Sequence, residues 1–173
     1  MNVFERAIAR SGLHARFTEG FNPKPRLEFA SPLGVGIESE EEIAAVDLEE
    51  AYPDAFAERL SAALPPGLTV LRSAVIPQKT GERRRSLMSL YWGSEYLLAT
   101  DPGPIGTEGK SVIEVSRDEA GWRVRLPGSS APSRSLPAVC LEQGIRRTRT
   151  YSTGPGGGPV SYFGDSFALE SRL

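Results

Sequence analysis

The first apolar positions of the chain repeat at the three- and four-residue spacing of an amphipathic helix, which predicts a helix over residues 2–10. A serine and a glycine follow at residues 11–12, and glycine readily adopts the left-handed conformation that ends many helices. A second apolar stripe covers residues 55–64 and is closed by two prolines and a glycine. This pattern predicts a second helix.

Between and after these helices the pattern changes to the period-two alternation of half-buried strands. It predicts strands over residues 13–17, 26–29 and 42–49, and the β-branched run 68–76 predicts one more. The arrangement is typical of a ferredoxin-like split β-α-β unit that lacks its first strand. That strand would be central, and its loss would leave backbone groups unpaired. We expect it upstream of Met1; the alternatives are a strand from the second half or a compromised fold.

The second half of the chain begins after a polar, arginine-rich connector at residues 77–85, which is the best candidate boundary. We therefore expect an α+β protein with a domain at 1–76, a smaller, mostly antiparallel β region with one helix at 77–153, and a flexible C-terminal tail at 154–173. The predicted strands cover 87–100, 111–116, 121–126 and 145–152, and the predicted helix covers 136–143.

Composition narrows the possible chemistry. The chain has 173 residues, of which 39% are hydrophobic, and no apolar run long enough to span a bilayer. Its first ten residues are charged rather than signal-like, so we expect a cytoplasmic protein with no membrane partner. One cysteine, Cys140, and one histidine, His14, cannot form a disulfide, a Cys/His zinc site or an iron–sulfur cluster. We assign no metal and no cofactor, and expect Cys140 to be a buried structural thiol.

The net charge of −2 conceals an asymmetry. Residues 1–76 carry seven Lys and Arg against twelve Asp and Glu, whereas residues 77–173 carry thirteen against ten. Most of the acid lies between Glu38 and Glu58, and the first 27 residues are net basic. An anion site would therefore lie in the opening segment or in the second half.

The densest group of special residues is the segment TEGFNPKPR at residues 18–26. Glycine permits a sharp turn, and two prolines fix extended geometry on either side of a lysine. A rigid loop of this kind can hold phosphate with its cations while the aromatic ring stacks on a base. The alternative is a simple strand connection whose phenylalanine packs on the core. The candidate ligand-binding residues here are Phe21, Asn22, Lys24 and Arg26.

A second cationic group lies in the predicted strand 145–152, where alternation places Arg147, Arg149 and Tyr151 on one face. A sheet face with arginine and tyrosine suits RNA. The run Arg83–Arg85 is a further cluster. Ordinary solvated arginines are the alternative for both, since a pI near 5.6 argues against tight non-specific binding.

The sequence supports a catalytic function less well than a binding function. His14 lies in a predicted strand without a serine or cysteine motif beside it, and the paired carboxylates between Glu40 and Glu50 are typical of a solvated edge. A hydrolase or transferase that uses His14, Glu19 and Asn22 remains an alternative, and it predicts a deep pocket at the loop. We assign no catalytic residue and expect binding rather than an enzyme.

Residues 3–49 resemble the radical-SAM-linked protein family, an uncharacterised bacterial domain found beside, or fused to the C-terminus of, a radical SAM protein. The resemblance rests on the helix pattern FERA and RSGL, on the (S/T)(Q/E)GFNP(H/K)P(R/K) loop at residues 18–26, and on PLGVGIESE at residues 32–40. It extends to about residue 74. Beyond that point the similarity is loose, although RRTRTY at residues 146–151 resembles a late Arg-Thr strand of the family.

The resemblance implies a strand and a Ser/Gly-His-Leu-Asp turn just before the first helix, and this chain does not contain them. It also implies a radical SAM protein as partner, and its association with ribosome and RNA-processing genes favours ribosomal or transfer RNA. A partner would supply the iron–sulfur cluster that this chain cannot form. We therefore expect an accessory protein that binds RNA or presents a substrate. The alternative is a module that docks on the enzyme through a sheet edge or the acidic segment, without nucleic acid.

Overall fold

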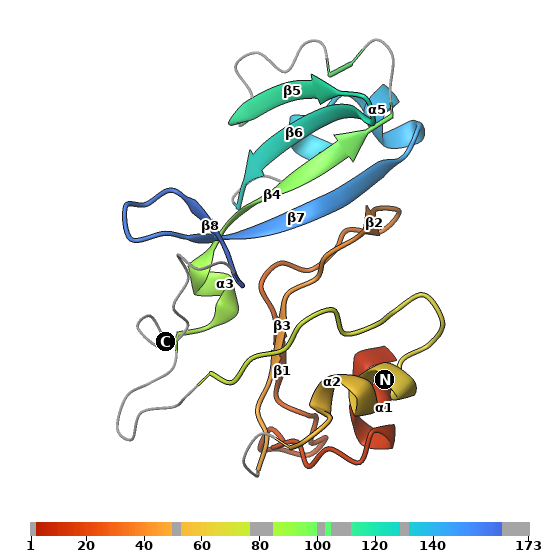
Figure 1. Ribbon diagram of the computed structural model, residues 1–173, viewed down its shortest axis with the longest axis vertical. Helices are drawn as coiled ribbons and strands as arrows, with labels where there is room; N and C mark the ends of the chain where they lie inside the picture. The colour runs from red at the N-terminus through yellow and green to blue at the C-terminus, as the bar shows by residue number, and fades with distance from the viewer. Residues whose placement is uncertain are drawn as a thin grey trace. The chain divides into compact units, whose positions relative to one another are not determined.

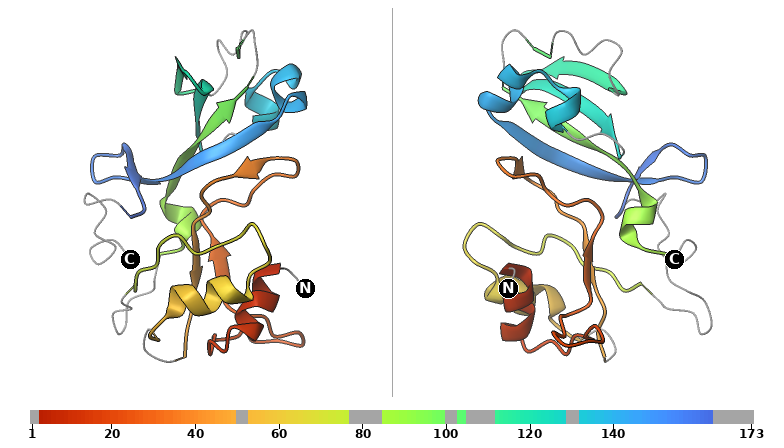
Figure 2. Two further views of the ribbon diagram at one scale, coloured as in Figure 1. Left: turned by 45° about the vertical axis from the view of Figure 1, so that its right-hand side comes forward. Right: turned by 180° about the vertical axis from the view of Figure 1, so that it is seen from behind.

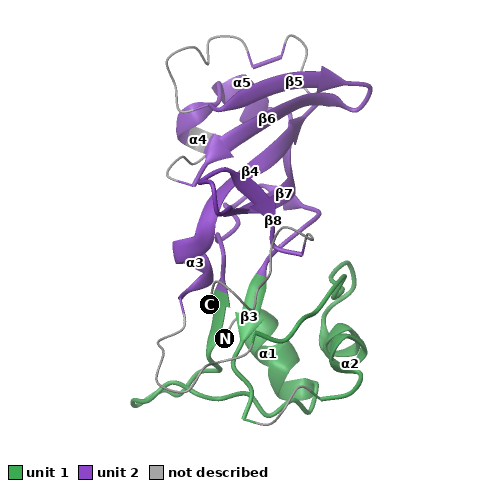
Figure 3. Ribbon diagram, turned by 60° about the vertical axis from the view of Figure 1, so that its left-hand side comes forward, with its two compact units in different colours: residues 1–28, 44–84, 173 green, residues 29–43, 85–172 purple. Residues whose placement is uncertain are grey.

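The computed structural model describes residues 3–49, 53–76, 85–99, 103–104, 112–128 and 132–163. They form two compact units, and each unit combines segments that are separated in the sequence (Figure 3). Unit 1 contains residues 1–28 and 44–84, and unit 2 contains residues 29–43 and 85–172. The predicted α+β class is confirmed, with most regular structure in sheets. Predicted features at residues 77–84, including Arg83 and Arg84, and at 164–173 lie outside the described residues.

Unit 1 contains two helices and a two-stranded sheet (Figure 1). Helix α1 (Val3–Arg10) buries Ala7 and Ile8 of its apolar stripe, and its last turn ends before Gly12, which has a φ of 70°. Helix α2 (Phe56–Ala63) packs beside it. Strand β3 (Ala44–Val46) pairs with β1 (Leu27–Phe29), whose last residue already belongs to unit 2. Both helix predictions are therefore confirmed.

Two of the strands predicted for unit 1 are not regular strands. Residues 13–17 make only isolated bridges, from Ala15 to Leu48 and from Phe17 to Pro25. Residues 68–76 form no strand at all, and the side chains of Leu71 and Val75 are 70% and 54% exposed. A β-branched sequence favours a strand only where another strand is available to pair with it. Within the described ranges, the β1–β3 sheet does not extend to this segment.

Unit 2 is built on a mixed sheet whose central strands are long and antiparallel. Among the described residues the strand order is β2-β7-β4-β6-β5, and β8 also pairs with β7. Since β4 takes one edge of β7, the short strands β2 and β8 share its other edge. Strand β2 is parallel to β7 and joins residues 38–39 to residues 146–147. The strands are β2 (Glu38–Ser39), β4 (Tyr91–Leu98), β5 (Glu114–Asp118), β6 (Gly121–Pro127), β7 (Ile145–Thr153) and β8 (Pro159–Ser161).

The core of unit 2 lies between one face of this sheet and the short helices α4 (Pro132–Ser135) and α5 (Ala138–Glu142) (Figure 2). Cys140 is fully buried there, as the sequence predicts. A third short helix, α3 (Leu87–Leu90), precedes β4 inside the range predicted as one strand. The core cluster comprises Tyr96, Leu98, Val124, Leu126, Leu136, Cys140 and Ile145.

The chain beyond β7 returns to the sheet instead of leaving it. The glycine-rich residues 154–158 form a tight turn in which the Gly157 N–H donates to the Gly154 carbonyl at 3.0 Å. Strand β8, which lies in the range predicted as a tail, then pairs with β7. Tyr162 follows, is 2% exposed, and donates its hydroxyl hydrogen to the Leu87 carbonyl at 3.1 Å. Residues 159–162 are therefore integrated into unit 2.

Candidate nucleic-acid interface

The GFNPKP segment is the tip of a hydrogen-bonded hairpin in unit 1. The Thr18 N–H donates to the Lys24 carbonyl at 2.8 Å, and the Arg26 N–H donates to the Arg16 carbonyl at 2.7 Å. The Thr18 hydroxyl accepts a further bond from the Lys24 N–H at 3.1 Å. These bonds enclose the Phe17–Pro25 bridge. The predicted rigid loop is thus a short antiparallel ladder, and residues 19–23 form its turn.

The ladder gives the hairpin two chemically different faces, because directly opposed residues of an antiparallel pair project to the same side. Phe17 and Pro25 oppose each other and share one face. Arg16, Lys24 and Arg26 lie on the opposite face, by the alternation of side chains along a strand. Arg16, Lys24 and Arg26 are all exposed. One face of the hairpin is therefore cationic and the other is apolar.

Phe21 projects from the tip of the hairpin. Its side chain is 106% exposed relative to an extended reference, so the alternative in which it packs on the core is wrong. Gly20 beside it has a φ of 130°, a conformation that glycine adopts without the strain of a side chain. Asn22 is exposed as well. The fold thus presents an aromatic ring to solvent next to a cationic face.

The cations of this hairpin are only lightly engaged by the protein itself. Lys24 Nζ lies 4.0 Å from a carboxylate oxygen of Glu5, and the lysine side chain is 65% exposed. Arg26 donates its Nε–H to the Phe17 carbonyl at 3.2 Å, which orients the guanidinium along the hairpin. The Glu5 side chain is 13% exposed, but the 4.0 Å separation and the exposed lysine make the ion pair with Lys24 weak. Both side chains can therefore reach an external anion at small cost.

The second predicted group, on β7, is divided between the two faces of the sheet. Arg147 pairs with Tyr96 of β4 and Arg149 with Glu95, so Thr148 is an additional residue in a β-bulge. The prediction that Arg147 and Arg149 share a face is wrong, because one extra residue shifts the alternation. Arg147 lies on the core side, and Arg149 lies with Tyr151 on the open side.

Arg147 is committed to an internal ion pair in unit 2. Its side chain is 1% exposed and binds both carboxylate oxygens of Glu42, with the Nε–Oε1 distance at 3.1 Å. It also donates to the Ser31 carbonyl at 3.1 Å. A buried guanidinium held in this way has little capacity left for a phosphate. The pair connects residues 105 positions apart, and no local pattern in the sequence indicates it.

The acidic segment expected at a solvated edge is attached to β7 along its length. Arg146 forms ion pairs with Glu38 at 2.9 Å and with Glu40 at 3.2 Å. A carboxylate oxygen of Glu41 accepts a hydrogen bond from the Thr150 N–H at 3.1 Å. These contacts continue the parallel β2–β7 pairing. The segment therefore serves unit 2 as a structural element.

The open face of the unit 2 sheet holds a cluster of charged and aromatic side chains around Glu95. Arg123 and Arg125 approach its carboxylate at 3.2 and 3.4 Å, and the Thr148 hydroxyl donates to it at 3.0 Å. Burial raises the pKa of Glu95, but the hydrogen bonds from Thr148 and the two arginines outweigh burial and leave the pKa below its usual value. The carboxylate therefore stays ionised and neutralises part of this face.

Tyr151 is partly enclosed by the same cluster. The Arg125 guanidinium lies 5.2 Å from its ring centroid, and the Trp92 ring meets it edge-on at 6.2 Å. Burial, followed by the charge of Glu95, raises the pKa of the Tyr151 hydroxyl. Arg149 is exposed beside it. Of the residues predicted on β7, Arg149 is the cation left accessible, while one side of the tyrosine ring is already covered.

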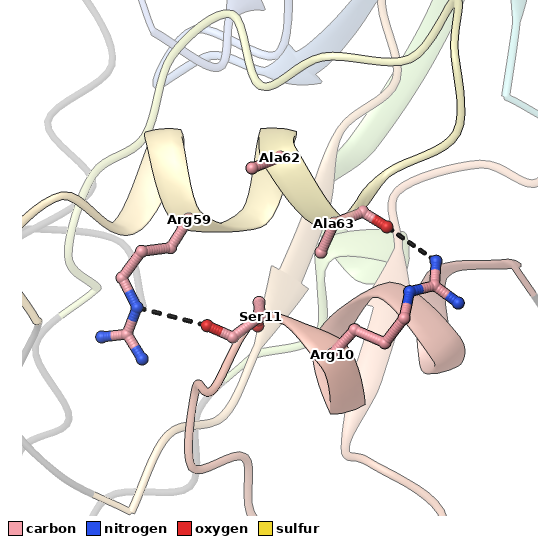
Figure 4. Close-up of a pocket in the computed structure, with 5 residues that line it drawn as sticks. All are labelled: Arg10, Ser11, Arg59, Ala62 and Ala63. Atoms are coloured by element: carbon pink, nitrogen blue, oxygen red, sulfur yellow. Dashed lines mark hydrogen bonds between the residues drawn. The ribbon is translucent and has the colours of Figure 1, made fainter.

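A hollow of about 370 Å³ lies elsewhere in unit 1, between α1 and α2 (Figure 4). Arg10 donates to the Ala63 carbonyl at 2.7 Å, and Arg59 donates to the Ser11 carbonyl at 3.2 Å, so each arginine reaches across to the neighbouring segment. None of the residues that line it comes from the hairpin tip. His14 is exposed. The pocket expected at Glu19 and Asn22 by the hydrolase alternative stays a prediction.

Neither a metal-binding cluster nor a membrane-spanning helix occurs in the described ranges. No group of three or more His, Cys, Asp and Glu side chains there is placed to hold a metal ion. No helix in the described part of the chain combines the length and the apolar character needed to cross a bilayer.

Comparison with known proteins gives one match. No curated protein and no solved structure matches this chain. A family model matches residues 1–125, a stretch that includes all of α1, the hairpin and strands β1 to β5. Because the match covers well over half of the chain, the protein belongs to the family described as "Uncharacterized protein conserved in bacteria (DUF2344)".

Proposed function

We propose that this protein is an RNA-binding accessory protein that acts through the hairpin of residues 16–26. The observation that carries the proposal is the full exposure of Phe21 at the tip of a hydrogen-bonded turn beside a cationic face. An exposed aromatic ring has an unfavourable contact with water, and stacking on a base removes it. Lys24 and Arg26 supply the charges that attract phosphate.

The hairpin is better suited to bind RNA than the open face of the unit 2 sheet. Arg123 and Arg125 are matched there by Glu95, Asp118 and Glu114, so the face has little net positive charge. The ring of Tyr151 is partly covered by Arg125. At the hairpin, by contrast, the aromatic ring is uncovered. We therefore place Phe21, Asn22, Lys24 and Arg26 in the binding site, with Arg149 and Tyr151 as a secondary contact and Arg147 as a structural residue.

The resemblance of residues 3–49 to radical-SAM-linked proteins supplies the partner in this proposal. A radical SAM protein would carry the iron–sulfur cluster and the reaction, and this chain would present the RNA or another substrate to it in the cytoplasm. In the same proposal, unit 1 corresponds to a ferredoxin-like split β-α-β unit, whose helices α1 and α2 follow the expected order.

The test is a salt titration of RNA binding with matched charge variants. Fluorescence anisotropy with transfer RNA between about 50 and about 200 mM salt should show steeply falling affinity for the natural chain. Lys24→Gln combined with Arg26→Gln should weaken binding about tenfold and flatten the salt slope by about one for each phosphate that the variant no longer binds.

The control is Arg146→Gln, which removes an arginine already paired with Glu38 and Glu40. Its affinity for RNA should stay close to that of the natural chain. Affinity no higher than that of an unrelated acidic protein would reject the proposal. An equal loss in both variants would reject the hairpin as the site.

The same exposed ring favours a second candidate function, docking on the radical SAM protein without RNA. Aromatic side chains flanked by cations are common anchors of protein interfaces. Charge reversal of the acidic residues 40–42 is not a clean test of this candidate. These residues bind Arg146, Arg147 and Thr150, so their substitution would also disturb the fold of unit 2. Phe21→Ala tests it: docking predicts loss of co-purification with the enzyme in ribonuclease-treated extract, whereas RNA binding predicts that co-purification is unchanged by this variant.

A further inference from the structure

The two faces of the hairpin bear on the kind of RNA that it can accept. Cations occur on one face, as Arg16, Lys24 and Arg26, while the opposite face carries Phe17 and Pro25. An element inserted into the groove of a duplex is flanked by the phosphates of both strands. It therefore needs cations on both of its sides, as sheet and helix readers of grooves have. The cations of this hairpin can contact the phosphates of only one strand.

The spacing of the cations fits one strand laid across the hairpin. Lys24 and Arg26 are two residues apart on the same extended arm, which separates them by about 7 Å. This distance is comparable with the separation of neighbouring phosphates along an extended strand. Arg16, opposite Arg26, widens the cationic face at its base. Two adjacent phosphates of one strand can therefore be contacted together.

The tip then requires an unpaired base. Inside a duplex both faces of a base are stacked on its neighbours, and a protein ring cannot reach them without extruding the base. Phe21 is fully exposed in the turn, three residues before Lys24, so a base of a single strand held by Lys24 and Arg26 lies within its reach. The exposed Glu19, which precedes the turn, carries a negative charge that disfavours a phosphate close to it.

We infer that the hairpin recognises unpaired RNA, in a loop or a single-stranded end, with one base on Phe21 and the adjoining phosphates on Lys24, Arg26 and Arg16. This inference rests on the proposed function. It narrows that function to a class of RNA and to one face of the hairpin.

The test compares a stem-loop RNA with the same RNA after a complementary strand has closed its loop into a duplex. Binding of the 173-residue chain is measured by anisotropy, and stacking is followed through a 2-aminopurine placed in the loop. The open loop should bind at least about tenfold more tightly than the closed one, and 2-aminopurine fluorescence should change only with the open loop.

Two variants locate the contact. Phe21→Leu keeps an apolar side chain but removes the flat ring, and it should weaken loop binding about tenfold and abolish the fluorescence change. Phe17→Leu makes the same exchange on the apolar face, where the side chain is 51% exposed. It should leave the affinity for the loop RNA and the fluorescence change as they are in the natural chain. Circular dichroism of both variants establishes that they are folded, and Phe21 is too exposed to matter for folding.

The outcomes distinguish recognition of unpaired RNA from RNA binding in general. Equal affinity for the open and the closed loop would overturn the inference and leave RNA binding intact. An equal loss in Phe17→Leu and Phe21→Leu would overturn the assignment to one face. No binding of either RNA above an acidic control protein would remove both the inference and the proposed function.

Discussion

Arg147 shows how the environment of a single residue decides its role. Its position in a strand beside Arg149 suggests a contact to RNA, yet its guanidinium is 1% exposed and binds Glu42 and the Ser31 carbonyl. A charge in such a place is tolerated because it is paired and hydrogen-bonded. Glu42 in turn accepts a hydrogen bond from the Ser39 hydroxyl. The pair therefore supports the fold of unit 2 and leaves recognition to other residues.

This assignment predicts a large difference between two glutamate variants of the same segment. Glu42→Ala leaves the Arg147 charge buried without its counter-ion and should lower the free energy of unfolding by about 3 kcal/mol or more. Glu38→Ala removes an ion pair whose glutamate side chain is 72% exposed, and should cost less than about 1 kcal/mol. Urea unfolding at neutral pH measures both. Similar losses in the two variants would contradict the account of Arg147.

Strand β7 shows the same dependence on context at the scale of an element. Its sequence predicts the strand itself, and the structure confirms it over Ile145–Thr153. The bulge at Thr148 was not predictable, because it depends on how β7 pairs with β4 and on the Thr148 hydroxyl meeting Glu95. Strict alternation therefore places Arg147 on the wrong face. The hairpin of residues 16–26 was predictable because its glycine and prolines act locally.

The bulge gives a deletion experiment with a matched control. Deleting Thr148 joins Arg147 to Arg149 in regular pairing with Tyr96 and Glu95, and every remaining side chain keeps its face. We expect a folded protein that is destabilised by about 1 to 2 kcal/mol through the lost hydrogen bond to Glu95.

Deleting Thr150, two positions further on, should have a much larger effect. A one-residue slip in a regular strand moves the following side chains to the opposite face. It would force either Arg149 or Tyr151 towards the core, and we expect no cooperative unfolding transition. Calorimetry of the two deletions measures this difference. A Thr148 deletion as disruptive as the Thr150 deletion would contradict the bulge.

The arrangement of the whole chain depends on pairings between segments that lie far apart in the sequence. Residues 29–43 follow unit 1 directly, yet they belong to unit 2 because β2 pairs with β7 and the acidic segment binds Arg146 and Arg147. Local pattern could not reveal this pairing, nor that residues 68–76 would lack a partner strand among the described residues. Helices α1, α2 and α5, most strands of unit 2 and the exposed basic turn were predictable, since local sequence determines them, whereas α3 lies in a range predicted as a strand.

At the scale of the whole molecule the two units differ in role: unit 1 carries the recognition hairpin, and unit 2 carries a sheet whose charges are largely matched internally. The most direct measurement is ultraviolet crosslinking of the full chain to a loop RNA, followed by mass spectrometry of the crosslinked peptides. We predict crosslinks within residues 16–26, with Phe21 as the main site, that disappear in Phe21→Leu. Crosslinks confined to unit 2, for example at Tyr151, would contradict the account.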